Sequence, residues 1–207
     1  CLFSICSIPL IYLIGRQLFD KKVGLFSATI LALSPFHLWY AQEVQPYSAA
    51  VFFALLISHL FLKAVESNGR KFWWFFGLIY IIGLYIDECL LLLIPVQILY
   101  LFFKQRCYVK FFVASIFGLA LLLSPKIPEA INTLIIIQRY GFWIPKPTIS
   151  ALLVTLENFG FGYNLPGSIY LVSDVLMALI LISVIKNLKN KINSQQGIIL
   201  CLIGFLV

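Results

Sequence analysis

Long apolar runs separated by short polar connections constrain the fold of this chain more than any other feature. They recur along its 207 residues, of which 62% are hydrophobic and only 11% charged. Soluble domains carry about 25% charged residues. Because one globular core cannot bury this much apolar surface, lipid must be the solvent for much of the chain, and backbone groups in lipid must pair within each segment. The pattern predicts an all-α fold, a polytopic transmembrane helical bundle.

Eight apolar stretches are candidate spans. The two on either side of Asp87 and Glu88 are shorter than the roughly 20 residues that a span normally needs. A single helix through this point would separate Lys71 from Lys104 and break the charge pattern, so we expect two short spans that meet at Asp87-Glu88. The expected spans are 2–15, 23–40, 47–65, 72–86, 89–103, 107–124, 168–185 and 197–207.

The basic residues indicate how these spans are oriented. Twelve of the fifteen fall in alternate connections, which leaves only Lys126, Arg139 and Lys146 on the opposite side. The positive-inside rule makes the side with twelve basic residues cytoplasmic. Most acidic residues, including Glu43, then face the non-cytoplasmic side. The net charge of +7 is explained by attraction to the inner leaflet and does not indicate a nucleic-acid partner.

The longest outer connection, residues 125–167, contains two amphipathic segments that suit helices lying on the membrane surface. Thr148 is placed to cap the second of them. Their apolar faces are Ile127, Ile131, Leu134 and Ile135 in the first segment, and Ile149, Leu152, Leu153 and Leu156 in the second.

The chain shows no internal repeat, low-complexity tract or linker, so residues 1–207 are expected to form a single transmembrane domain. The sequence begins and ends inside apolar runs. We therefore expect it to be a fragment that is cut inside its first and last spans, and that neither folds nor acts alone.

Residues 34–47 form the most unusual polar stretch, because they place an imidazole, a carboxylate and two amides between two long apolar runs. Ionisable groups close to hydrocarbon are costly and usually mark a functional site. Glu43 supplies the carboxylate, and it has a second, compatible interpretation as a cap for the helix that begins near Pro46. Tyr40 and Gln42 are suited to hydrogen-bond a sugar, although Tyr40 equally suits an aromatic belt at the membrane surface.

The other reactive side chains are explained by packing or by hydration. The five cysteines have no paired spacing and are predicted to pack as small apolar residues. His37 and His59 have no second ligand at metal-binding spacing, so no metal site is expected, and no cofactor motif is present. Asp87 and Glu88 are adjacent, and adjacent residues on a helix do not face each other. A hydrated turn is therefore favoured over a paired-carboxylate centre, with substrate contact as the alternative.

Three stretches of the chain resemble type C glycosyltransferases, and among these the bacterial relatives of the protein O-mannosyltransferases and the aminoarabinose transferase. The most specific is 40–47, Tyr-Ala-Gln-Glu-Val-Gln-Pro-Tyr, which is similar to the family's Tyr-Ser-Gln-Glu-x-Arg-x-Tyr. Residues 12–37 and 142–162 support it. The resemblance implies an integral protein of the bacterial plasma membrane and an inverting transferase. Such an enzyme passes a sugar from a polyprenyl-phosphate carrier to a lipid, glycan or protein acceptor on the non-cytoplasmic face, in contact with membrane lipids.

The resemblance also implies roles for individual residues. Glu43 would organise the site, while the main catalytic Asp is expected upstream of this sequence. Gln45 stands where the family usually has Arg, and a neutral amide gives phosphate no fork-shaped cation. Arg139, Lys126 or Lys146 would then have to compensate. The expected substrate-binding residues are Tyr40, Gln42, Gln45, Tyr47 and Arg139.

Two other functions remain open. A transporter or lipid flippase also has intramembrane charges and interrupted helices, but the acids here gather at the outer interface and no two halves look alike. A non-catalytic membrane scaffold derived from such an enzyme is favoured a little by Gln45. It is also favoured because the first outer loop, which carries the catalytic acid in the family, is not found in this sequence. Binding of a polyprenyl-phosphate sugar separates the enzyme from the scaffold.

Overall fold

The structure is a computed structural model that describes residues 1–43, 45–67, 70–104, 108–122 and 124–140, and positions 148, 151, 154, 155, 158 and 175. This part of the chain contains helices and no strand, which confirms the all-α prediction. Apart from position 175, the expected spans 168–185 and 197–207 lie outside the described residues. The helices are α1 (Leu2–Leu18), α2 (Lys21–Leu33), α3 (Pro35–Gln42), α4 (Tyr47–Glu66), α5 (Arg70–Ile86), η1 (Glu88–Leu92), α6 (Leu93–Lys104), α7 (Val109–Leu122), η3 (Ser124–Lys126) and α8 (Ile127–Tyr140).

Helix length tests the membrane prediction only in part. Within the described ranges, α4 is the one helix long and apolar enough to cross a bilayer by itself, and α2 with α3 passes the same test only as a bent pair. The other apolar helices, α1, α5, α7 and the η1–α6 segment, are shorter. The structure alone therefore leaves the polytopic arrangement as a prediction.

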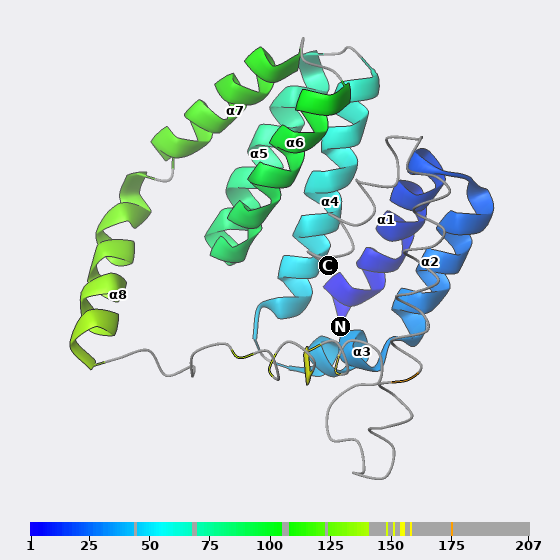
Figure 1. Cartoon of the computed structure of the whole chain (residues 1–207), viewed down its shortest axis with the longest axis horizontal. Helices are drawn as coiled ribbons and strands as arrows, with labels where there is room; N and C mark the ends of the chain where they lie inside the picture. The colour runs from blue at the N-terminus through cyan, green and yellow to red at the C-terminus, as the bar shows by residue number, and fades with distance from the viewer. Residues whose placement is uncertain are drawn as a thin grey trace.

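The expected span 23–40 is divided into two helices, because the chain bends by 55° between α2 and α3. Pro35 lacks an N–H group and its ring clashes with the carbonyl four residues earlier, so a helix cannot continue unbroken through it. Ser34 ends α2 and caps α3, since its Oγ accepts a hydrogen bond of 3.3 Å from the N–H of His37. The break turns α3 across the first turns of α1 and α4 (Figure 1).

Polar contacts show which helix ends lie together. Gln17 Nε2 donates a hydrogen bond of 2.8 Å to Glu66 Oε2, so α1 and α4 end side by side. Helices α1, α4 and α6 run away from the α3 end of the bundle, and α2, α5 and α7 run back toward it (Figure 1). This alternation is the one that the charge pattern predicts. The end opposite α3 carries Arg16, Lys21, Lys22, Lys63, Lys71 and Lys110.

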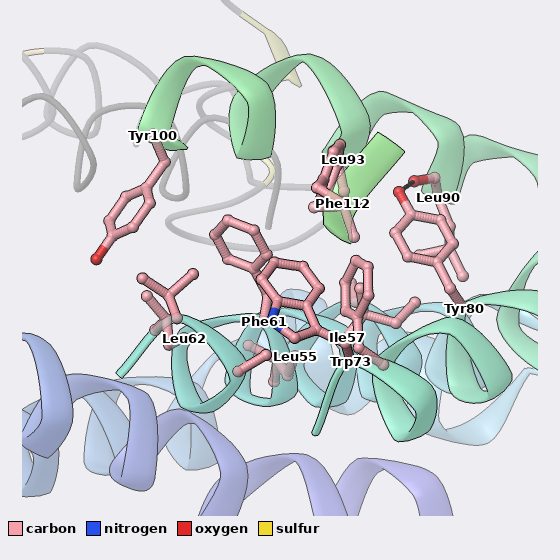
Figure 2. Close-up of a cluster of buried hydrophobic side chains, with 14 of the residues drawn as sticks. Leu55, Ile57, Phe61, Leu62, Trp73, Tyr80, Leu90, Leu93, Tyr100 and Phe112 are labelled. Carbon is pink, nitrogen blue, oxygen red and sulfur yellow. Dashed lines mark hydrogen bonds between the residues drawn. The ribbon is translucent and has the colours of Figure 1, made fainter. Parts of the chain in front are cut away.

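The core forms around α4, where aromatic rings fill the space between helices. Phe61 is the centre of this cluster, and its ring lies 5.5 Å from that of Tyr100 and 5.9 Å from those of Phe76 and Phe112 (Figure 2). Each such pair adds about 0.5–1.5 kcal/mol beyond the burial of its area. Rings from α5, α6 and α7 thus lock these helices onto α4, which fixes the position of its first turn.

Helices α1 and α2 pack through glycines. A Cβ on Gly24 would lie 2.6 Å from the carbonyl oxygen of Tyr12, and one on Gly15 would lie 2.8 Å from the Cα of Gly24. Small residues allow helix backbones to approach closely in membranes. Asp20 caps α2 by accepting a hydrogen bond of 2.8 Å from the N–H of Val23. This close antiparallel pair brings α3 back to the beginning of α1.

Candidate functional site

The polar stretch folds into an elbow, here the α3 elbow (residues 34–43 and 45–47), which is α3 with its connection to α4. His37 anchors it to α1, because its Nε2–H donates a hydrogen bond of 3.2 Å to the carbonyl oxygen of Ser4. The imidazole is buried, with 7% of the residue exposed. The expectation that His37 is a packed histidine rather than a base is therefore supported.

Two tyrosines, at the two ends of the 40–47 stretch, join α3 to α4. The rings of Tyr40 and Tyr47 lie 4.8 Å apart at an interplanar angle of 74°, and the ring of Phe36 lies 4.6 Å from that of Tyr40. Edge-to-face contacts of this kind are favourable. Tyr40 is half-buried and Tyr47 is exposed. The two expected substrate-binding tyrosines are thus brought together, and Tyr47 is the more exposed of the two.

Glu43 is exposed and forms the C-cap of α3. Its Oε1 accepts a hydrogen bond of 2.9 Å from Trp39 Nε1. The N-cap of α4 is Pro46, without a side-chain capping bond, so the interpretation of Glu43 as the cap of the helix that begins near Pro46 is wrong. A carboxylate at a helix C-terminus opposes the helix dipole by about 0.3–1 kcal/mol. Helix stability therefore gives no reason for an acid at this position.

The two glutamines lie on either side of Glu43 in the chain. Gln42 and Gln45 are both exposed, and neither side-chain amide has a hydrogen-bond partner among the described residues. An amide offers one carbonyl oxygen and two N–H donors. The elbow thus presents a carboxylate and two unpaired amides within four positions of the chain, a set of groups that suits a polyhydroxylated ligand.

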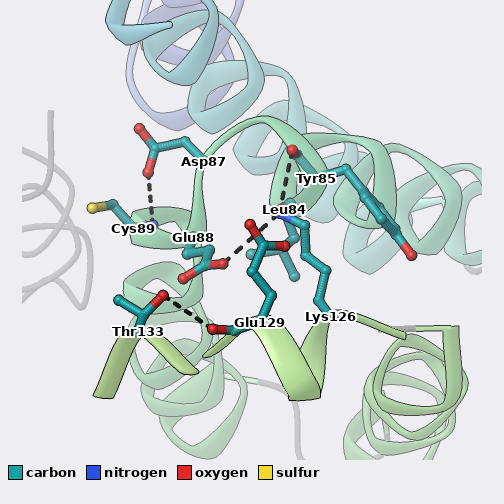
Figure 3. A network of polar contacts seen from close by, with 8 residues as sticks. All are labelled: Leu84, Tyr85, Asp87, Glu88, Cys89, Lys126, Glu129 and Thr133. Atoms are coloured by element: carbon teal, nitrogen blue, oxygen red, sulfur yellow. Dashed lines mark hydrogen bonds and ion pairs between the residues drawn. The ribbon is translucent and has the colours of Figure 1, made fainter. Parts of the chain in front are cut away.

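Of the cations expected on the outer side, the two that the structure describes do not lie at the elbow. Arg139 is exposed in the last turn of α8, and α8 stands apart from α3 (Figure 1). Lys126 lies at the end of α5 instead, where its Nζ is 3.4 Å from the carbonyl oxygens of Leu84 and Tyr85 and 3.8 Å from Glu88 Oε1 (Figure 3). Lys126 therefore holds the turn between α5 and α6 rather than a phosphate at Glu43. Lys146 lies outside the described residues.

Asp87 and Glu88 have separate tasks in this turn. Asp87 Oδ1 accepts a hydrogen bond of 2.9 Å from the N–H of Cys89 and so caps η1, whereas Glu88 pairs with Lys126. The two carboxylates contact different groups, which supports their interpretation as parts of a turn. In the outer connection, Thr148 Oγ1 accepts a hydrogen bond of 3.2 Å from the N–H of Ala151, as expected of a cap. The predicted apolar face beyond it lies outside the described residues.

An apolar cavity opens beside the elbow, between the first turns of α4 and the η1–α6 segment. Its volume is about 140 Å³. The α4 residues that line it lie three, four and seven positions after Tyr47, so they share the face of α4 on which Tyr47 stands. The lining residues are Ala50, Val51, Ala54, Cys89, Leu90, Leu92 and Leu93.

Trp39 belongs to this site although the sequence did not single it out as a partner of Glu43. Residues four apart on a helix face each other. The signal in the sequence was an indole N–H donor, Trp39, four positions before a carboxylate, Glu43.

The fold and the site define an apolar helical protein that exposes a carboxylate, two amides and one tyrosine, Tyr47, at one end of its bundle. The family model of the dolichyl-phosphate-mannose-protein mannosyltransferases matches residues 1–131 of the 207. The chain belongs to this family, whose members are integral membrane proteins. This confirms the expectation of a mannosyltransferase-type glycosyltransferase of membranes. The match includes the α3 elbow and Lys126 and ends before Arg139. No curated protein and no solved structure matches the chain.

Proposed function

We propose that this protein is an inverting glycosyltransferase that takes a sugar from a polyprenyl-phosphate carrier. It passes the sugar to a lipid, glycan or protein acceptor on the non-cytoplasmic face of the membrane. The observation that carries the proposal is Glu43, an exposed carboxylate at a helix end where it opposes the helix dipole. Residues that break a local rule of stability are typical of functional sites. The family match supplies the reaction class.

In this proposal Glu43 organises the site, and is not the base that takes the acceptor proton. Its carboxylate accepts hydrogen bonds from sugar hydroxyls, while Gln42 and Gln45 donate and accept through their amides. Tyr47 adds an exposed hydroxyl, and Tyr40 supports its ring from α3. Together these groups orient the donor for transfer, which is a major source of rate enhancement.

The lipid part of the donor needs an apolar environment beside this polar site. The cavity between α4 and η1 lies on the Tyr47 face of α4, so a prenyl chain entering from the membrane meets apolar side chains there. The phosphate needs a cation or amide donors. Gln45 offers amide donors at the elbow, and the proposal for Arg139 as a phosphate partner rests on its charge and exposure alone.

The test is transfer by the full-length protein in membranes, with radiolabelled mannose on a polyprenyl-phosphate carrier as donor. Glu43→Gln keeps the size of the side chain, removes its charge and replaces one acceptor oxygen by an NH2 donor. We expect transfer to fall by at least roughly 100-fold at unchanged membrane insertion. Glu129→Gln is the matched control, because Glu129 is an exposed carboxylate of α8 away from the elbow. Undiminished transfer by Glu43→Gln would sink the assignment.

A further inference from the structure

Trp39 and Glu43 form a pair on one face of α3. The indole Nε1 and the carboxylate Oε1 are 2.9 Å apart and their residues are separated by four positions. Trp39 leaves 49% of its surface exposed. Trp39 is therefore not a core residue like Trp73, which is 5% exposed. Its hydrogen bond to Glu43 fixes the direction of the indole.

The bond offsets an unfavourable charge. Glu43 lies at the negative end of the dipole of α3, and the positive edge of the indole at Nε1–H faces its oxygen. Hydrogen bonds with one ionised partner are roughly twice as strong as neutral ones. The bond involves Oε1 only, so Oε2 keeps its lone pairs for other donors. Trp39 thus fixes Oε1, and Oε2 remains available to a substrate.

The helix that carries this pair, α3, is anchored to both α1 and α4. His37 ties α3 to the carbonyl of Ser4, and the ring of Tyr40 packs against that of Tyr47. Sites built on helices hold their geometry better than sites on loops. Since Glu43 is the last residue before the connection to α4, its side chain would adopt several rotamers without a partner on α3.

We propose that Trp39 is a positioning residue for glycosyl transfer. Its indole N–H holds Oε1 of Glu43, so that Oε2 is oriented toward a hydroxyl of the substrate. This inference rests on the proposed function, in which Glu43 organises the site. It adds a residue whose effect runs entirely through Glu43.

The experiment is a double-mutant cycle in the full-length protein in membranes, with the same labelled polyprenyl-phosphate mannose as donor. Trp39→Phe keeps an aromatic ring and removes the N–H donor. Loss of one hydrogen bond to a charged group predicts a fall in kcat of about tenfold, with KM for the donor within about twofold. In the Glu43→Ala background the same substitution is expected to change nothing further, because its target is gone.

Trp74→Phe is the matched control, since Trp74 is an 80% exposed tryptophan on α5. It is expected to leave kcat unchanged. An unchanged kcat in Trp39→Phe, with transfer still lost in Glu43→Ala, overturns the positioning role and leaves the proposed function standing. An equal fall in kcat with and without the Glu43 carboxylate also overturns it, because Trp39 would then act independently. Full transfer by Glu43→Ala instead overturns the proposed function itself.

Discussion

Gly24 of α2 lies against the backbone of α1 beside Gly15, so closely that neither residue has room for a Cβ. The contact sets the direction in which α2 leaves α1 and, through the bend at Ser34, the place where α3 crosses the first turns of α1 and α4. The position of Glu43 therefore depends on a packing contact that lies a full helix away from it.

Replacing Gly24 by Ala tests this dependence. The added Cβ would lie 2.6 Å from the carbonyl oxygen of Tyr12 and 2.9 Å from the N of Arg16, and both are backbone atoms that cannot rotate away. Overpacking of this kind costs about 1–3 kcal/mol. We expect a lower thermal midpoint in detergent and reduced transfer. Gly118→Ala is the control, because a Cβ there meets nothing within 4 Å; an equal loss in both variants would contradict the close-packing explanation.

Lys126 provides a second test, at the turn between α5 and α6. Lys126→Met removes two contacts with the last carbonyls of α5, the ion pair with Glu88 and the cation that lies 5.2 Å from the centre of the Tyr85 ring. Glu88→Gln removes the ion pair alone, and exposed pairs contribute only about 0–1 kcal/mol. We expect hydrogen exchange of the turn 87–92 to rise strongly in Lys126→Met and little in Glu88→Gln. Equal exchange in the two variants would show that the carbonyl contacts add nothing.

The sequence predicted the helices well because their apolar runs are long. The expected segment 47–65 matches α4 to within one residue, and the break at Asp87 was found from length and charge. The bend at Ser34 was missed, although a serine followed by proline is the local signal for the end of one helix and the cap of the next. Because the residues on both sides of Pro35 are mostly apolar, the stretch was interpreted as a single span.

The sequence predicted which residues belong to the site, but not how they are arranged in space. Tyr40, Gln42, Glu43, Gln45 and Tyr47 are near one another in the chain, so their proximity needed no tertiary information. Lys126 contacts a carbonyl 42 residues earlier in the chain. A contact at that separation depends on how α5 and α7 pack, which periodicity does not specify. The sequence therefore left Lys126 as a possible phosphate partner, and the structure gives it a structural task.

Tyr47 distinguishes substrate binding from support of the fold. Tyr47→Phe keeps the ring that packs against Tyr40 and removes the exposed hydroxyl. If the hydroxyl bonds the sugar, its loss raises KM for the donor by roughly 2–10-fold at unchanged thermal stability. Tyr85→Phe, at another exposed tyrosine, is the control. An unchanged KM in Tyr47→Phe would leave Tyr47 with the packing role alone.

Ala54 tests whether the cavity beside the elbow receives the prenyl chain of the donor. Ala54→Phe places a large side chain in a space of about 140 Å³. Displacing about two CH₂ groups of a prenyl chain from apolar contact costs about 1.6 kcal/mol, which raises KM by more than tenfold. A water-soluble donor with a short prenyl chain does not reach the cavity, so its KM is expected to stay the same. Ala114→Phe, at an exposed alanine of α7, controls for the added bulk. A similar rise in KM for long-chain and short-chain donors would mean that the substitution disturbs the elbow rather than a lipid site.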